Sequence, residues 1–216
     1  MRRMMLPAVF AACLFACPAF AQGETAPAAA PAAQACELHV WPGSDLIHLY
    51  YGWFHGGTID GSVKNRQGYP DAPENPLTAQ VQVRLLANMD LSTLMALPGY
   101  EVIVHPQSLT SREIRASTTR LAESSSPCYA ELMVDDLLLT QNVIGGNALR
   151  ASFRFRDFGP DAAPRRMFGT FAMTKLTLFP PDAQEDMPTA SAELQQAFTS
   201  NVKQFITALR KPPRRR

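Results

Sequence analysis

The chain has 216 residues, of which 46% are hydrophobic and 18% charged. This length suits one domain with a substantial core and is too short for two large ones. Two of the 20 basic residues lie in 1–21 and four in 211–216, which leaves 14 against 19 acidic residues in between. A body with this mildly acidic balance has no basic face for nucleic acid, so nucleic-acid binding is not expected.

Residues 1–21 have the three parts of a secretory signal peptide. They begin with the basic pair Arg2 and Arg3, continue with an apolar run of about a dozen residues and end with Ala-Phe-Ala. The run is too short for a comfortable membrane span. We therefore expect cleavage after Ala21 and export across the inner membrane to the periplasm.

Lipidation is an alternative fate for this segment. Residues 14–17, Leu-Phe-Ala-Cys, resemble the lipobox that precedes the lipid-modified cysteine of bacterial lipoproteins. Phe15 is bulky where that motif favours a small residue, so soluble export is the first prediction. Lipidation of Cys17 would instead anchor the protein at the outer membrane.

Both ends of the remaining chain are predicted to be disordered. Residues 22–35 are mostly Ala and Pro, a composition typical of a spacer between a membrane anchor and a domain. Residues 211–216 form a basic tail that is either solvated or in peripheral contact with an anionic membrane surface. A single folded domain is expected over residues 36–210.

Two cysteines, Cys36 and Cys128, remain once residues 1–21 are removed. A pair in an exported chain predicts a disulfide, and neither cysteine has a second Cys or a His at zinc-ligand spacing. The bridge would staple the first predicted strand to the start of a predicted hairpin. Closing a loop of this length is worth roughly 4 to 5 kcal/mol in the chain-entropy model.

The first part of the domain predicts short strands and a long loop. Residues 37–55 contain two strand candidates. Their expected apolar faces comprise Leu38 and Val40 in the first, and Ile47, Leu49, Tyr51 and Trp53 in the second. Residues 56–76 predict an exposed loop with a short strand at Thr58–Val63, and this loop is a first place to look for a partner surface.

Helical signals follow the loop. Asn75 suits an N-cap and Pro76 the first helical position. The expected apolar stripe comprises Leu77, Val81, Leu85 and Leu86, although residues 80–86 also alternate as a strand would. Asp90–Leu97 predicts a second helical piece. The next predicted elements are a strand at 100–105 and, at 106–127, a loop with a short helix or edge strand.

The passage Cys128–Gly159 predicts a long β-hairpin at the centre of the sheet, because apolar and polar residues alternate along it. In its second limb the apolar face comprises Leu149, Ala151, Phe153 and Phe155, and the polar face Arg150, Ser152, Arg154 and Arg156. In its first limb the apolar face comprises Ala130, Leu132, Val134 and Leu138, and the polar face Glu131 and Asp135.

The register of this hairpin depends on its loop. A two-residue loop at Gly145 and Gly146 places Asp135 opposite Arg156. The same register leaves Asp136 on the apolar face, which marks either an edge position or a wrong register.

The last two predicted elements complete an α+β fold. A strand beginning at Met167 has Phe168, Thr170, Ala172, Thr174, Leu176 and Leu178 on one side. A helix at Ser191–Arg210 carries an apolar stripe of Leu194, Ala197, Phe198, Val202, Phe205 and Leu209 that is expected to pack on the sheet. We thus expect a mainly antiparallel or mixed sheet with a central hairpin, backed by two or three helices including this amphipathic one.

The sequence contains no catalytic signature. G-x-S-x-G, H-E-x-x-H, phosphate-loop and dinucleotide glycine patterns do not occur. The S-x-x-K match at Ser200 to Lys203 lacks the accompanying motifs of penicillin-binding proteins and lies inside the last predicted helix, so it is a chance match. No cofactor is expected, and the chain is more simply interpreted as a non-enzyme.

The histidines give an alternative. His39, His48 and His55 lie close together in the sequence with Asp60 nearby, and His39 and His48 are predicted to share the more polar face of their sheet. A metal site needs three such ligands to converge, whereas solvated histidines are commoner. A small periplasmic enzyme or metal-binding protein using this region is therefore the second functional hypothesis.

Three arginines form the polar face of the predicted hairpin. Arg150, Arg154 and Arg156 could bind an anionic partner, such as a phosphate-bearing lipid or the acids of another protein. Pairing within the sheet, with Glu131 and Asp135, is the simpler interpretation.

From Asn75 onward the order is helix, strand, long hairpin, strand and amphipathic C-terminal helix. This order resembles the small α/β domains of bacterial envelope accessory lipoproteins, of the curli-secretion CsgG or transport-auxiliary kind, over about half of the chain. The resemblance implies a sheet backed by helices on one face and a role in assembly or interaction. The leading hypothesis is an exported, non-enzymatic protein that binds another envelope protein or envelope component, with any membrane contact by lipid anchor or peripheral.

Overall fold

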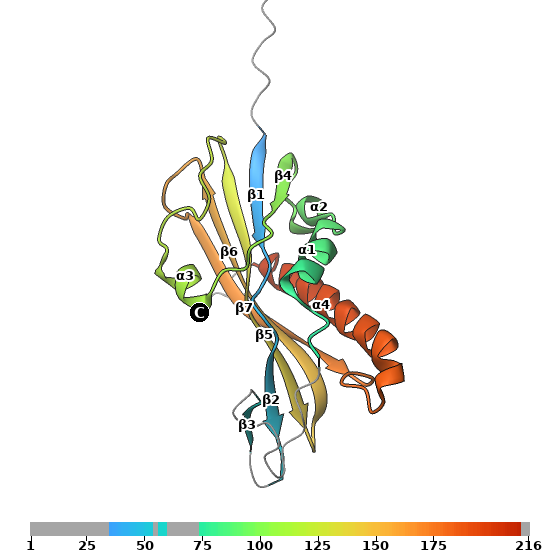
Figure 1. Ribbon diagram of the computed structural model, residues 1–216. Helices are drawn as coiled ribbons and strands as arrows, with labels where there is room; N and C mark the ends of the chain where they lie inside the picture. The colour runs from blue at the N-terminus through green and yellow to red at the C-terminus, as the bar shows by residue number, and fades with distance from the viewer. Residues whose placement is uncertain (1–34, 54–55, 60–73, 213–216) are drawn as a thin grey trace, which may run out of the picture. The chain divides into compact units, whose positions relative to one another are not determined.

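The computed structural model describes residues 35–53, 56–59 and 74–212. Within these ranges seven strands form one mixed sheet and four helices accompany it, which confirms the α+β class (Figure 1). The predicted signal peptide, Cys17, nearly all of the spacer, His55, Asp60 and residues 213–216 lie outside the described residues. No helix in the described ranges is long and apolar enough to cross a membrane.

The elements have the following bounds. The strands are β1 (Cys36–Trp41), β2 (Ile47–Tyr51), β3 (Gly56–Ile59), β4 (Tyr100–Val104), β5 (Tyr129–Asn142), β6 (Gly146–Gly159) and β7 (Arg166–Leu176). The helices are α1 (Ala79–Ala87), α2 (Leu91–Met95), α3 (Ser111–Ala116) and α4 (Met187–Leu209), with a 3₁₀ turn η1 (Gln184–Asp186) before α4.

Strand β5 is the axis of the sheet. Along one edge it pairs in parallel first with β1 and then, further along, with β2, while β6 runs antiparallel along its other edge (Figure 1). Strand β4 extends the sheet beyond β1, β3 extends it beyond β2, and β7 extends it beyond β6. Two successive short strands therefore share one edge of a single 14-residue strand.

The joint between β1 and β2 includes Gly43, which lies close against side chains of β5. A Cβ atom at Gly43 would lie 2.9 Å from Cγ1 of Val134, so a larger residue would require the Val134 side chain to move. Gln82 of α1 satisfies the backbone of this joint, because its Oε1 accepts from the Gly43 N–H at 2.8 Å and its Nε2 donates to the Gly43 carbonyl at 3.4 Å. The fully buried Gln82 thus fixes α1 against the turn.

The register predicted for the hairpin is wrong, and a β-bulge is the reason. Glu131, not Asp135, lies opposite Arg156, and the pairing shifts between Val134 and Asp136. The extra residue at Asp135 inverts the alternation of the first limb beyond it. Leu137, rather than Leu138, is then fully buried with the core, and Asp136 pairs with Ser152 on the polar face.

The hairpin loop also differs from the prediction. Asn142 pairs with Gly146, which leaves the three residues 143–145 in the loop. The Asn142 side chain accepts from the N–H groups of Ile144 and Gly145, both at 2.9 Å, and so holds the turn. Gly146 follows with a φ of 79°, a conformation that favours glycine.

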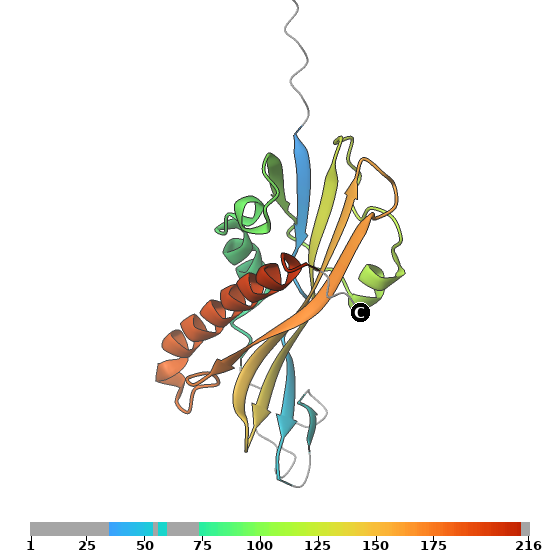
Figure 2. The same ribbon diagram turned by 180° about the vertical axis from the view of Figure 1, so that it is seen from behind.

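Helices α1, α2 and α4 lie on one face of the sheet, which we call the inner face (Figures 1 and 2). The predicted stripe of α4 is confirmed: its members Leu194, Ala197, Phe198, Val202, Phe205 and Leu209 are all buried. The predicted apolar face of the second hairpin limb is buried in the same core. Helix α4 begins at Met187, four residues before the expected start.

Three earlier elements depart from expectation. Helix α1 starts after an N-cap at Thr78, while the Asn75 side chain accepts from the Leu77 N–H in a turn before it. In β2 the faces are reversed: His48 is buried, whereas Ile47 and Tyr51, and Trp53 beyond the strand, are exposed. Strand β3 begins at Gly56, earlier than predicted.

The predicted disulfide joins Cys36 and Cys128, whose Cα atoms lie 4.7 Å apart. It connects the first residue of β1 to the residue before β5. The Glu37 N–H donates to the Cys128 carbonyl at 3.0 Å beside it. The bridge therefore holds the parallel β1–β5 pairing at its start, as the sequence predicted.

Candidate binding surface

The sheet face opposite α4, which we call the outer face, has two different halves. Its covered half lies under α3 and the segment 117–128, and includes Glu131 and Arg156 (Figure 1). Its open half comprises the outward side chains of β7, from Met167 opposite Arg156 to Met173 opposite Arg150, and those of β6 toward the hairpin loop. We define the open half by five residues: Arg150, Arg154, Met167, Phe171 and Met173.

A buried ion pair occupies the centre of the covered half. The Arg156 guanidinium donates to the Glu131 carboxylate at 2.7 Å, and both side chains are almost fully buried. Glu131 also accepts from the Tyr129 hydroxyl at 2.9 Å and the Leu121 N–H at 2.6 Å, while Arg156 donates to the Ser117 carbonyl at 2.7 Å. Burial, with the nearby Glu131 carboxylate, raises the pKa of Tyr129. Every charge in this network has partners, so it serves the fold.

A second polar chain runs from β4 to the segment over β1. His39 Nδ1 lies 2.8 Å from His105 Nε2, and His39 Nε2 lies 3.0 Å from a Glu37 carboxylate oxygen that also accepts from Ser124 at 2.5 Å. The Trp41 ring stacks on His105 with centroids 4.2 Å apart. The hydrogen bonds from Ser124 and His39 lower the pKa of Glu37. Both rings are used for holding β1, β4 and the covering segment together.

The bulge residue Asp135 is the centre of a third cluster. Its carboxylate accepts from Arg154 Nε at 2.6 Å and from the Ser111 hydroxyl at 2.5 Å. Arg115 of α3 lies 3.7 Å from both Asp135 and Asp136. The bulge thus presents two neighbouring carboxylates to α3 and β6, and Arg154 is neutralised there rather than left for a ligand.

Arg150 differs from the other two arginines of the strand. Among the described residues it has no ion pair; its guanidinium carbon lies 4.0 Å from the centroid of the Phe171 ring. Its Nε is buried and donates to no acceptor. A groove of about 370 Å³ lies beside it, lined by Arg150, Ser152, Phe171 and the Asp135 cluster. Of the three arginines of the predicted anionic-partner face, Arg154 and Arg156 pair with carboxylates, whereas Arg150 pairs with none among the described residues.

Apolar side chains are exposed along β7 beside Arg150. Met167 is 67% exposed, Phe171 52% and Met173 51%. They alternate with residues that face α4, because β7 is a strand with one face on the core. A row of large apolar side chains next to a cation with an unused donor is a recognised feature of interaction surfaces.

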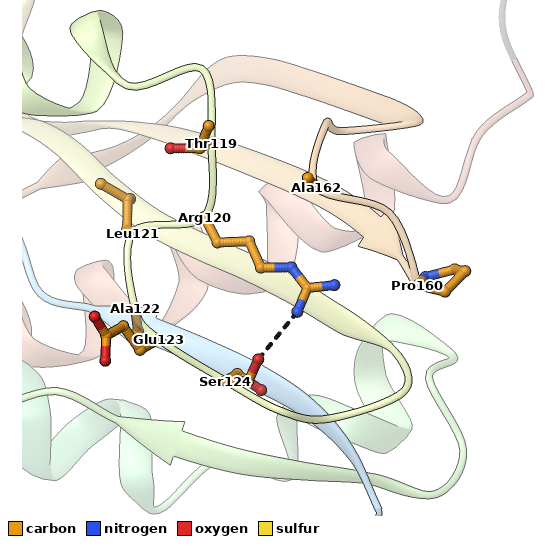
Figure 3. Close-up of a pocket in the computed structure, with 8 residues that line it drawn as sticks. All are labelled: Thr119, Arg120, Leu121, Ala122, Glu123, Ser124, Pro160 and Ala162. Atoms are coloured by element: carbon orange, nitrogen blue, oxygen red, sulfur yellow. Dashed lines mark hydrogen bonds between the residues drawn. The ribbon is translucent and has the colours of Figure 1, made fainter.

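The largest cavity described, about 500 Å³, lies between the segment 119–124 and the turn after β6 (Figure 3). Arg120 projects across it and donates to the carbonyls of Ser124 at 3.4 Å, Gly159 at 3.3 Å and Asp161 at 3.1 Å. Its guanidinium carbon also lies 4.8 Å from the centroid of the Tyr129 ring. Arg120 is thus used to tie the covering segment to the turn, and this cavity is a weaker candidate than the open half.

Two residues of the predicted histidine site, His39 and His48, lie apart in the structure. His39 pairs with Glu131 on the outer face, whereas His48 pairs with Leu139 of the inner core, so the two lie on opposite faces and not on one polar face. Their β5 partners are eight residues apart, about 26 Å along a strand. No group of three potential ligands occurs within the described ranges, which include neither His55 nor Asp60. His48 has a buried Nε2 without a partner, and burial lowers its pKa.

Sequence reasoning missed His105 and the β7 row. His105 follows β4, 66 residues after His39, and only the parallel pairing of β1 with β4 brings the two rings together. For β7, the alternation predicts the core side, and the opposite side forms the exposed row. Their exposure was available from the alternation itself, because Met167, Phe171 and Met173 occupy odd positions while the core takes the even ones.

Comparison with known proteins gives structural neighbours only. No protein-family model and no curated protein matches the chain. A DUF330 protein from Xanthomonas campestris is 9% identical with a TM-score of 0.40, covering 80% of this chain and 82% of that one. A hypothetical protein from Chlamydia trachomatis is 11% identical with a TM-score of 0.37, covering 81% and 99%. A further uncharacterized protein is 15% identical with a TM-score of 0.35, covering 78% and 86%.

Proposed function

We propose that the chain is an exported cell-envelope protein that acts by binding another envelope component through the open half of its outer face. Export is supported by the signal-like residues 1–21 and by the disulfide, since disulfides persist in oxidising compartments. The element order, which resembles that of envelope accessory lipoproteins of the curli-secretion CsgG or transport-auxiliary kind, supports a role in assembly or interaction.

The observation that carries the binding role is the apolar row of β7 beside Arg150. Met167, Phe171 and Met173 remain exposed, whereas the other face of the strand buries Ala172 and Leu176 and packs Phe168 against the core. Burying such side chains against a partner gains roughly 25 cal/mol for each Å² of apolar surface removed from water. Arg150 adds a positive charge that has no carboxylate partner among the described residues, and an anionic group of the partner would complement it.

Acid–base groups on the outer face support binding rather than catalysis. Glu131 and Asp135 are neutralised by arginines at hydrogen-bonding distance, and His39 lies between Glu37 and His105. A general acid or base must have a reacting group within reach of its proton. These side chains instead use their donors and acceptors on each other and on the backbone.

The test is a crosslinking pull-down from cell envelopes, with fractionation of the same cells. The variants are Phe171→Lys in the open half and Ile144→Lys at the hairpin tip, where Ile144 is 79% exposed. Both add one cation and remove one exposed apolar side chain. We expect the envelope fraction to contain the wild type and both variants. Of these three proteins, we expect only Phe171→Lys to lose the captured component. Equal capture by both variants, or retention in the cytoplasm, would refute the proposal.

Anchoring is tested separately. Intact mass of the wild type and of Cys17→Ser distinguishes a cleaved soluble protein from a lipidated one. We expect a mass that corresponds to cleavage after Ala21 and is free of lipid. A wild-type mass increased by acyl chains, lost in Cys17→Ser, would instead place the protein at the outer membrane.

A further inference from the structure

We infer that the free edge of β7 binds an extended, acidic polypeptide segment of the envelope partner by strand addition; this rests on the proposed function and specifies its partner. The inference combines three independent features of the open half: an unpaired sheet edge, an apolar row along that edge, and a local excess of positive charge.

The edge is long and unprotected. Strand β7 has eleven residues and pairs only with β6 among the described strands. Within the described ranges, no hydrogen bond from another element reaches the main chain of Arg166–Leu176. It contains no proline and no bulge, two of the features that block edges, and its charged residues are the cations Arg166 and Lys175, which disfavour pairing with another basic edge. Its outer N–H and C=O groups are therefore available to an added strand.

The other terminal strands are poorer templates. Strand β4 has five residues and β3 only four, against eleven in β7. A strand of eleven residues is about 36 Å long, enough for several main-chain hydrogen bonds in register. Because affinity in strand addition comes from these bonds, the longest free edge is the favoured site.

Side chains on the outer face of β7 give the added strand something to pack on. Met167, Phe171 and Met173 project from this face, with Gly169 between the first two. An added strand would place every second side chain beside this row. Methionine adapts its shape to varied partners, and Phe171 already supports the Arg150 guanidinium.

The charge of the edge selects an acidic occupant. Strand β7 contains Arg166 and Lys175 and no carboxylate. Arg150 is a neighbouring cation without an ion pair among the described residues, whereas the outer-face acids of β5 already contact Arg154, Arg156 and Arg115. Pairing of β7 with a second copy would bring together two basic edges. A carboxylate-bearing strand is complementary to both Lys175 and Arg150.

The experiment begins with photocrosslinking of the full chain in cells. A benzoylphenylalanine replaces Phe171 on the edge strand or, as the matched control, Ile144 at the hairpin tip. Mass spectrometry then identifies the attached segment. We expect a crosslink from position 171 to a polypeptide segment with net negative charge and alternating apolar residues, and no crosslink to that segment from position 144.

The identified segment, made as a synthetic peptide, is the probe for the second step. Its affinity is measured for the wild type, Lys175→Glu, Arg150→Glu and the control Lys203→Glu on the exposed side of α4. We expect each of the first two reversals to weaken binding about tenfold and Lys203→Glu to have no effect. Amide exchange in β7 should slow in the complex, as main-chain pairing requires.

The outcomes separate this inference from the proposed function. A crosslink at position 171 to a lipid, to a second copy of the chain or to a basic segment overturns the acidic strand but leaves the binding surface in place. Binding of the peptide without slower exchange in β7 overturns strand addition alone. No crosslink at position 171 in envelopes overturns both.

Discussion

Arg156 and Arg150 occupy equivalent positions on one strand and face the same side of the sheet, yet their surroundings differ. Arg156 is buried beneath the segment 117–128 and donates to Glu131 at 2.7 Å. Arg150, six residues earlier, lies over the exposed Phe171 ring, and within the described part of the chain it has no carboxylate partner and its Nε no acceptor. The contrast follows from what covers each position: the covered half uses its charges to hold the fold, and the open half leaves a charge and apolar surface available.

The largest expected effect is loss of the disulfide, which restrains only the covered half. Replacing Cys36 and Cys128 by Ala should lower the free energy of unfolding by roughly 4 to 5 kcal/mol, because the unfolded chain regains the entropy of a loop whose ends are 92 positions apart. Urea denaturation with and without reductant measures this loss. Two free thiols in the unreduced wild type would contradict it.

Replacing Arg156 should lower the free energy of unfolding nearly as much as loss of the disulfide does. Arg156→Met leaves the fully buried Glu131 carboxylate without its cation, and we expect a loss of about 3 to 5 kcal/mol in the free energy of unfolding. The matched change Arg150→Met should cost less than about 1 kcal/mol, because it removes only a partly exposed contact with Phe171. Similar losses in the two variants would remove the distinction between the halves.

A smaller effect is a loss of stability in mild acid. Burial lowers the pKa of His48, and burial together with the nearby His39 lowers that of His105. The two histidines therefore take up a proton at higher pH in the unfolded chain than in the folded one. Their contribution to the free energy of unfolding is fully present above about pH 6.5 and falls as the pH drops through that value. Denaturant midpoints at pH 7.5, 6.5 and 5.5 measure the slope.

His48→Leu provides the control for this pH effect. The substitution removes the titratable ring, whose buried Nε2 has no hydrogen-bond partner among the described residues. The denaturant midpoint of the variant should therefore fall less between pH 7.5 and 5.5 than that of the wild type. The carboxylate of Glu37, whose pKa is lowered by Ser124 and His39, loses its contribution only at more acidic pH. An unchanged slope in His48→Leu would show that His48 is not responsible.

The smallest expected change in stability is that of Phe171→Lys. The side chain is half exposed and outside the core, so the free energy of unfolding should change by no more than about 0.5 kcal/mol. Thermal or urea unfolding beside Ile144→Lys checks this. A loss above about 2 kcal/mol would show that Phe171 serves the fold and would remove it from the binding surface.

The elements predicted well are those whose signal is local and regular. The alternation of β6 and the stripe of α4 each depend on a single element with one buried face, and the structure buries both as expected. The disulfide followed from the count of cysteines in an exported chain. The sequence also predicts that arginines of β6 pair with Glu131 and Asp135. The predicted register places Asp135 opposite Arg156, whereas in the structure Arg156 pairs with Glu131 and Arg154 with Asp135.

The features missed depend on neighbours distant in sequence. The bulge at Asp135 brings two carboxylates to Ser111 and Arg115 of α3, and no periodicity within β5 predicts that contact. The faces of β2 were reversed because its neighbour along the sheet is the second half of β5, which puts His48 beside Leu139 in the core. An alternating strand specifies two faces, but only its partners decide which one is buried.

The most direct test of the open half as a binding surface is hydrogen exchange of the protein with and without the envelope component that it captures. In the free protein, β7 amides should exchange faster than those of β5, which has strands on both edges. In the complex we predict slower exchange confined to β7 and its neighbours in the open half. Protection of the segment 117–128 with no change in β7 would contradict this surface.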